Sequence, residues 1–208
     1  MLDEVRTALV TGGTVRLGRA IAETLRARGW TVLTSSHRAD AGADLTADLS
    51  ESLGAARLYG AALRLLGGHP PDALVNNAAL FTGDAAALAA VNFEAPRKLT
   101  MLMAGRETGR GAVVNVLDAR SRDGAYGESK RALREFTVQA AAMFLDTLRV
   151  NAVAPGPVLP PEDVHEKAGE TPLGRPRPQD VADAVAFLLE AEATTGCIVP
   201  VDGGQGLL

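Results

Sequence analysis

The chain has 208 residues, a formal net charge of −4 and one cysteine, Cys197. This length suits one domain with one core, and a mildly acidic chain without a Lys/Arg run argues against nucleic-acid binding. A small-molecule substrate fits this charge better. A lone cysteine excludes an internal disulfide, no apolar run is long enough to span a membrane, and the first residues lack a signal-peptide pattern. From these three features we expect a cytoplasmic protein.

The chain opens with an apolar run, a glycine turn and a helix with a four-residue apolar repeat. The pattern predicts a strand at 7–10, a turn at 11–18 and a helix that begins at Leu17 and stops at Gly29. Such a turn gathers backbone N–H groups and the positive end of a helix dipole, which suits a pyrophosphate. Alone, it is equally consistent with a plain strand-to-helix connection.

A second strand, predicted at 30–35, completes a βαβ unit. Its tip carries His37 and Arg38, and the first acid after it is Asp40. A carboxylate at this tip would select a free ribose 2′-hydroxyl, whereas an arginine favours a 2′-phosphate. The tip therefore predicts a nucleotide that carries a 2′-phosphate, with a plain solvated loop as the alternative.

The rest of the chain alternates between strand and helix patterns. Strands are expected at 44–49, 73–79, 112–117, 148–153 and 198–201, and helices at 50–66, at 85–103 with a break at Pro96, at 126–144 and from Pro178. Residues 159–177 read as irregular, and His69 reads as a loop histidine. This alternation predicts an α/β fold, a doubly wound parallel sheet with helices on both faces. Asn77, Asp118 and Gly156 follow strand ends, so they should meet the glycine turn in one crevice.

Tyr126 and Lys130 are four residues apart at the start of a predicted helix, so their side chains share one face. An ammonium beside a phenol lowers a pKa that starts near ~10, which suits acid–base chemistry, although such pairs also occur by chance. Asn92 lies in an apolar stretch and is either a structural hydrogen-bond post or part of a site.

Six motifs, in this order, resemble the short-chain dehydrogenase/reductase family over nearly the whole chain: Thr11-Gly12-Gly13 through Gly18, Asn76-Asn77-Ala78, Asn92, Tyr126 with Lys130, Asn151 through Pro157, and Val201-Asp202-Gly203-Gly204. The resemblance implies a single Rossmann-type domain over 1–208 that binds a nicotinamide cofactor. It also implies that Tyr126 is the catalytic acid, that Lys130 holds the nicotinamide ribose and lowers the tyrosine pKa, and that Asn92 supports a proton-relay water. A homodimer or homotetramer through 92–106 and 126–144 is expected on the same ground.

Within the family, the chain is similar to the pteridine reductases. Asp118 stands where a serine is usual, and Phe81 follows the Asn-Asn-Ala turn where an aromatic stacks on the pterin; a loop anchor is the alternative for Phe81. The implied reaction is hydride transfer from NADPH to a pterin- or dihydrofolate-like ring, with catalytic residues Asp118, Tyr126, Lys130 and Asn92. The implied substrate residues are Arg16, Phe81, Asp118 and Tyr126. The implied cofactor residues are Gly12, Thr14, Arg16, Leu17, Gly18, His37, Arg38, Asp48, Leu49, Asn77, Ala78, Tyr126, Lys130, Pro155, Gly156 and Val158.

The chain departs from the family pattern in three places. Only seven residues separate Asp118 from Tyr126, Ala79 replaces a small polar residue, and the region after Pro157 is short. Ser121 is a second candidate for the usual serine. The alternatives to a pterin reductase are a carbonyl or alcohol reductase of the same family and a non-catalytic NADP(H)-binding protein.

Overall fold

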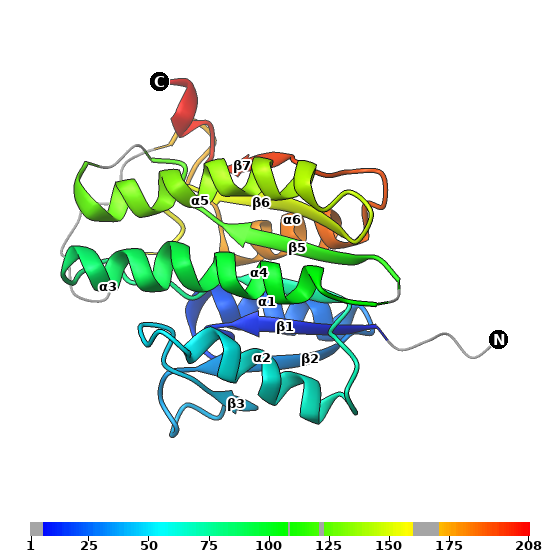
Figure 1. Ribbon diagram of the computed structural model, residues 1–208. Helices are drawn as coiled ribbons and strands as arrows, with labels where there is room; N and C mark the ends of the chain where they lie inside the picture. The colour runs from blue at the N-terminus through cyan, green and yellow to red at the C-terminus, as the bar shows by residue number, and fades with distance from the viewer. Residues whose placement is uncertain (1–5, 108, 121–122, 160–170) are drawn as a thin grey trace.

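The computed structural model describes residues 6–107, 109–120, 123–159 and 171–208. At its centre is a seven-stranded, wholly parallel sheet in the order β3-β2-β1-β4-β5-β6-β7 (Figure 1). The strands are β1 (Thr7–Thr11), β2 (Thr31–Ser36), β3 (Leu45–Thr46), β4 (Ala73–Asn76), β5 (Gly111–Val116), β6 (Leu148–Pro155) and β7 (Ile198–Val201). The predicted α/β fold, a Rossmann-type doubly wound sheet, is confirmed.

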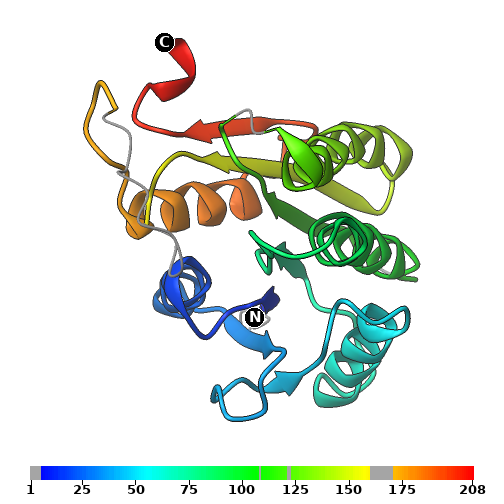
Figure 2. The same cartoon turned by 90° about the vertical axis from the view of Figure 1, so that its left-hand side faces the viewer.

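Helices cover both faces of the sheet. They are α1 (Arg16–Ala27), α2 (Gly54–Leu65), α3 (Ala85–Ala89), α4 (Ala95–Ala104), α5 (Gly124–Met143) and α6 (Pro178–Glu190), with a π-helical segment η1 (Ala90–Glu94) and a 3-10 turn η2 (Gln205–Leu207). Figure 2 looks onto the carboxyl ends of the strands and shows α1 and α6 on one side and α2, α4 and α5 on the other.

Alternation along the strands builds two cores, because successive side chains point to opposite faces. On β1, Leu9 packs with the layer of α2, α4 and α5, while Val10 packs with α1 and α6. On β4, Leu74 and Val75 divide in the same way. Both cores are fully buried at these strands, which explains why the strands read as continuous apolar runs.

The strand order reverses beside β1, which pairs with β2 on one edge and β4 on the other. The connections that follow β1 and β4 therefore diverge at the carboxyl ends of the strands. In open α/β sheets this divergence opens the crevice in which ligands bind.

The third strand and the second helix are shorter than predicted. A strand expected over 44–49 covers only Leu45–Thr46, and a helix expected from Ser50 begins at Gly54. The polar side chains are the reason. Asp44 Oδ2 accepts hydrogen bonds from the backbone N–H and the hydroxyl of Thr34, and Asp48 Oδ1 accepts from the N–H and the hydroxyl of Ser50. The chain therefore turns on both sides of β3.

The break predicted at Pro96 is wrong, because the helical path continues through it; a wider turn lies earlier, in the π-helical segment η1. Pro96 itself occupies the first turn of α4, where a missing N–H leaves no helical hydrogen bond unmade. The helical path from Ala85 to Ala104 is therefore unbroken, and its wide turn carries Asn92. Residues 171–177 are irregular as predicted, whereas 160–170 lie outside the described residues.

Sequence reasoning missed a buried charge that fixes α6 against the sheet. The Arg149 guanidinium donates to the carbonyls of Leu188 and Leu189 at 2.8 and 2.6 Å and to that of Thr194 at 3.2 Å. These carbonyls lie at and beyond the carboxyl end of α6, where a cation is favoured by the helix dipole. Burial lowers the pKa of Arg149 from its usual value.

Candidate active site

A cavity of about 700 Å³ opens at the carboxyl ends of the strands. It brings together residues from the connections after β1, β2, β3, β4, β5 and β6 and from the first turns of α5. Every predicted site residue except Asn92 lines it: Gly12, Thr14, Arg16, Leu17, Gly18, His37, Arg38, Asp48, Leu49, Asn77, Ala78, Phe81, Asp118, Tyr126, Lys130, Pro155, Gly156 and Val158.

The glycine turn is held to the end of β4 by an amide. Asn77 Nδ2 donates to the carbonyls of Thr11 and Gly12 at 3.0 and 3.1 Å, and the Thr11 hydroxyl accepts from the Asn77 and Ala78 N–H groups. A Cβ on Gly18 would lie 1.9 Å from the Gly12 carbonyl oxygen. The turn can therefore take this shape only with glycine at position 18.

Arg16 also contributes to the shape of this turn. Its φ is +51°, in the left-handed region, where an L-residue other than glycine is disfavoured by roughly 1–2 kcal/mol. Among the described residues it is the one non-glycine with a positive φ, and it lines the cavity. Strain of this kind gathers at ligand sites.

At the tip of β2, Arg38 faces an acid that sequence reasoning did not pair with it. Its Nε and Nη2 each lie 3.1 Å from an Asp40 carboxylate oxygen. The Arg38 guanidinium holds the pKa of the exposed Asp40 below its usual value. A phosphate bound here would compete with Asp40 for a bidentate partner, and His37 lines the cavity beside it.

At the other end of the cavity, the phenol of Tyr126 meets a carboxylate. The Tyr126 hydroxyl donates to Asp118 Oδ2 at 3.0 Å. The ring of Phe81 stacks on the Tyr126 ring, with centroids 5.0 Å apart and planes 18° from parallel. Phe81 is 53% exposed and does not belong to the core, so the alternative of a core-packed loop anchor is wrong. An aromatic face, a phenol and a carboxylate thus share one wall.

Lys130 lies one turn after Tyr126, as the spacing predicts. Its Nζ donates to the carbonyl of Val116 at the end of β5, at 2.9 Å. Burial lowers the pKa of Lys130 from 10.5 to about 8, against an opposing effect of the Asp118 charge. The ammonium is therefore held in place but close to losing its proton at neutral pH.

This pKa predicts a pH-dependent stability. The folded pKa of about 8 lies below the unfolded value of 10.5, so between these pH values the unfolded chain binds more protons, and stability rises with pH. The difference between the two pKa values corresponds to a gain of about 3 kcal/mol in the free energy of unfolding. This gain is absent below pH 8 and complete above pH 10.5. We expect the free energy of unfolding of the wild type to rise relative to that of Lys130→Met, measured by urea unfolding from pH 7 to 10.5. Parallel pH curves for the two proteins would contradict the burial of the ammonium.

Asn92 lies behind the cavity wall rather than in it. Its Oδ1 accepts from the Leu80 N–H at 2.8 Å, and its Nδ2 donates to the Leu80 carbonyl and to the Ser129 hydroxyl. The side chain is fully buried, so it is the structural hydrogen-bond post of the two alternatives. This amide ties the loop before Phe81 to α5, and the support of a proton-relay water by Asn92, which the resemblance implies, stays a prediction.

Sequence reasoning also missed Arg120 and Ser129. Arg120 lines the cavity two residues after Asp118, and Ser129 links Asn92 to α5. The short spacing from Asp118 was the one available signal for Arg120. Ser121 lies outside the described residues.

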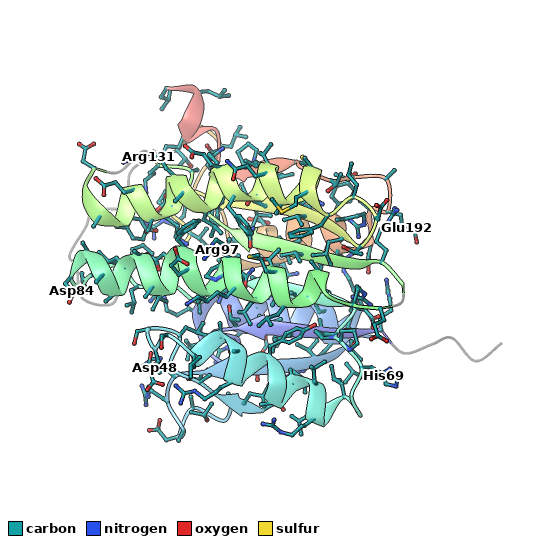
Figure 3. All side chains as sticks on the ribbon, viewed as in Figure 1. Asp48, His69, Asp84, Arg97, Arg131 and Glu192 are labelled. Carbon is teal, nitrogen blue, oxygen red and sulfur yellow. The ribbon has the colours of Figure 1, made fainter. Side chains whose placement is uncertain are left out.

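His69 is far from the site. Figure 3 shows Asp48 at the end of the sheet where the cavity opens and His69 at the opposite end, after α2. Within the described ranges, no three His, Cys, Asp or Glu side chains are grouped so as to hold a metal ion. None of the helices that the structure describes combines the length and the apolar character needed to cross a bilayer.

Comparisons with known proteins show that this chain is similar to oxidoreductases. The model of the family described as "Enoyl-(Acyl carrier protein) reductase" matches residues 71–205. The chain is 34% identical to the uncharacterized oxidoreductase YmfI of Bacillus subtilis, over 96% of this chain and 98% of that protein. It is 33% identical to the L-xylulose reductase of Bos taurus, over 96% of each.

Solved structures give the same picture. FolM alternative dihydrofolate reductase 1 from Brucella canis, complexed with NADP, superposes with a TM-score of 0.85 at 32% identity, over 98% of this chain and 95% of that one. The protein of the same description from Brucella suis, also in complex with NADP, gives 0.84 at 31% identity, over 98% and 96%.

Proposed function

Because this chain belongs to the short-chain dehydrogenase/reductase family, we propose that it is an NADPH-dependent reductase of a pterin- or dihydrofolate-like substrate. The observation that carries the proposal is the hydrogen bond from the Tyr126 hydroxyl to Asp118, with Phe81 stacked on the same ring. An aromatic wall suits a flat heterocycle, and a carboxylate next to a phenol suits its polar ring nitrogens. The solved structures of FolM dihydrofolate reductases support this substrate class.

The cavity fits a dinucleotide phosphate. Gly12 and Gly18 leave room for close backbone approach, and Arg38 with His37 offers cationic partners for a 2′-phosphate once Arg38 releases Asp40. Lys130 and Asn77 line the same cavity and would hold the nicotinamide end. When bound, the cofactor supplies a hydride.

The chain's own contribution is to orient the substrate and to move one proton. The Tyr126 hydroxyl is the proton donor, because it lines the cavity beside Phe81 and Asp118, where a substrate ring would lie. Asp118 accepts the hydrogen bond of the phenol and holds the hydroxyl at this wall, a proton from solvent replaces the one that Tyr126 gives up, and Lys130 supplies positive charge beside Asp118. Phe81 excludes water from the ring face on the open side.

A substrate panel followed by NADPH absorbance tests the function. We expect dihydrobiopterin or dihydrofolate to be reduced, with NADPH preferred over NADH, and Phe81→Ala to raise the KM for the pterin about tenfold because the stacking face is lost. Val15→Ala is the matched control, since Val15 also lines the cavity and is exposed but lies at the glycine turn.

Two other outcomes distinguish the alternatives. Turnover of simple ketones or sugars but not of pterins would make the chain a carbonyl reductase, the class to which the L-xylulose reductase relative belongs. Binding of NADPH without oxidation by any member of the panel would make it a non-catalytic NADP(H)-binding protein.

We also propose that the protein is a cytoplasmic homodimer or homotetramer with one domain per chain. Exposed apolar side chains on α4 and α5 support contact between copies there, namely Met101, Leu102, Val138 and Met143. Light scattering of the purified protein measures the number of copies.

A further inference from the structure

Arg120 shares a partly buried corner of the cavity with Asp118. Their side chains are 24% and 8% exposed, and Arg120 Nε lies 3.6 Å from Asp118 Oδ1. The same oxygen accepts from the backbone N–H of Arg120 at 2.9 Å. Residue 120 therefore holds Asp118 Oδ1 twice, once through the main chain and once through a charge.

The other oxygen of this carboxylate has a different partner. Asp118 Oδ2 accepts from the Tyr126 hydroxyl at 3.0 Å. A carboxylate is planar, so fixing one oxygen fixes the direction of the other. With Oδ1 held by residue 120, Oδ2 has to face the phenol.

Among the described residues, the groups shown to face Asp118 come from two segments. Arg120 faces it from the connection after β5, and Tyr126 and Lys130 face it from α5. Lys130 is tied to the Val116 carbonyl, and the Arg120 charge adds to the backbone hydrogen bond in holding Asp118 Oδ1. Within the described part of the chain, the Arg120 guanidinium is the cationic group that forms an ion pair with Oδ1.

We propose that Arg120 is a positioning residue that sets the orientation of Asp118 toward the Tyr126 hydroxyl; the inference rests on the proposed function. Arg120 acts through Asp118 and not on the substrate.

The test compares Arg120→Met with Arg120→Lys. Methionine keeps an unbranched side-chain stem and the backbone hydrogen bond but removes the charge, and lysine restores a charge. We expect Arg120→Met to lower kcat about tenfold with an unchanged Kd for NADPH, because a misdirected catalytic group slows the reaction without weakening binding. Arg120→Lys should recover most of this loss. Arg19→Met is the matched control, since Arg19 pairs only with Glu23 on the exposed face of α1 among the described residues.

A second readout does not depend on turnover. The chain has two tyrosines, so in a Tyr59→Phe background Tyr126 alone carries a ¹³Cζ tyrosine label. We expect Arg120→Met to shift this NMR resonance as the phenol loses its fixed acceptor, and Arg120→Lys and Arg19→Met to leave it in place.

Three results would overturn the proposal: an unmoved Tyr126 resonance in Arg120→Met, an unchanged kcat, or a loss of NADPH affinity as large as the loss of kcat. If no substrate of the panel is reduced, the proposed function fails while the NMR comparison still decides the role of Arg120.

Discussion

Tyr126→Phe should lower kcat on the order of a thousandfold while the affinity for NADPH stays within about twofold of the wild type. The substitution removes one hydroxyl, the group that donates to Asp118 at 3.0 Å, and keeps the ring that stacks on Phe81. The wall of the cavity therefore keeps its shape while the proton that the reaction needs is gone. Steady-state kinetics and NADPH fluorescence titration measure the two quantities separately.

Tyr59→Phe is the matched control for this substitution. Tyr59 is the other tyrosine of the chain and is buried in the core layer of α2, away from the cavity residues. The same chemical change at Tyr59 should leave kcat unaltered. Undiminished turnover in Tyr126→Phe would remove the phenol from the mechanism and leave Asp118 as the acid.

The fold could be predicted from the sequence because its signals are local. Each strand of the sheet interior is buried on both faces, so apolar runs such as Ala73-Leu74-Val75 mark strands directly. The glycine turn and the spacing of Tyr126 and Lys130 are also local, and the parallel topology brings them to one cavity without further information. The order of the elements therefore fixes which residues meet.

Features set by side-chain direction could not be predicted. Whether Asn92 points into the cavity depends on the wide turn of η1, which no periodicity indicates. Arg38 was predicted as a phosphate ligand from its place in the chain, but its ion pair with Asp40 depends on the turn between them. Arg120 contacts Asp118 for the same reason, through a turn of two residues. In each case the missing information is the local backbone path after a strand end.

Those backbone paths depend most strongly on Gly18. We expect Gly18→Ala to weaken NADPH binding on the order of a hundredfold and to lower the thermal midpoint. A Cβ there would lie 1.9 Å from the Gly12 carbonyl oxygen and 2.6 Å from Asn77 Nδ2. Because the first of these is a backbone atom, the turn itself must move, and overpacking of this kind costs roughly 1–3 kcal/mol. The same displacement breaks the Asn77 hydrogen bonds that hold the turn against β4. Isothermal titration with NADPH and a thermal melt measure both effects.

Gly60→Ala separates this steric effect from the general effect of replacing a glycine. Gly60 lies within α2, and a Cβ there would meet only the Arg64 guanidinium, at 3.7 Å. Alanine restricts the unfolded chain more than glycine does and suits a helix interior, so Gly60→Ala should stabilise the protein by about 0.5–1 kcal/mol with unchanged NADPH affinity. Opposite signs for the two variants would tie the loss at position 18 to the close approach of the turn. If Gly18→Ala bound NADPH as tightly as Gly60→Ala does, the turn would not cradle the cofactor, and the dinucleotide would have to lie elsewhere in the cavity.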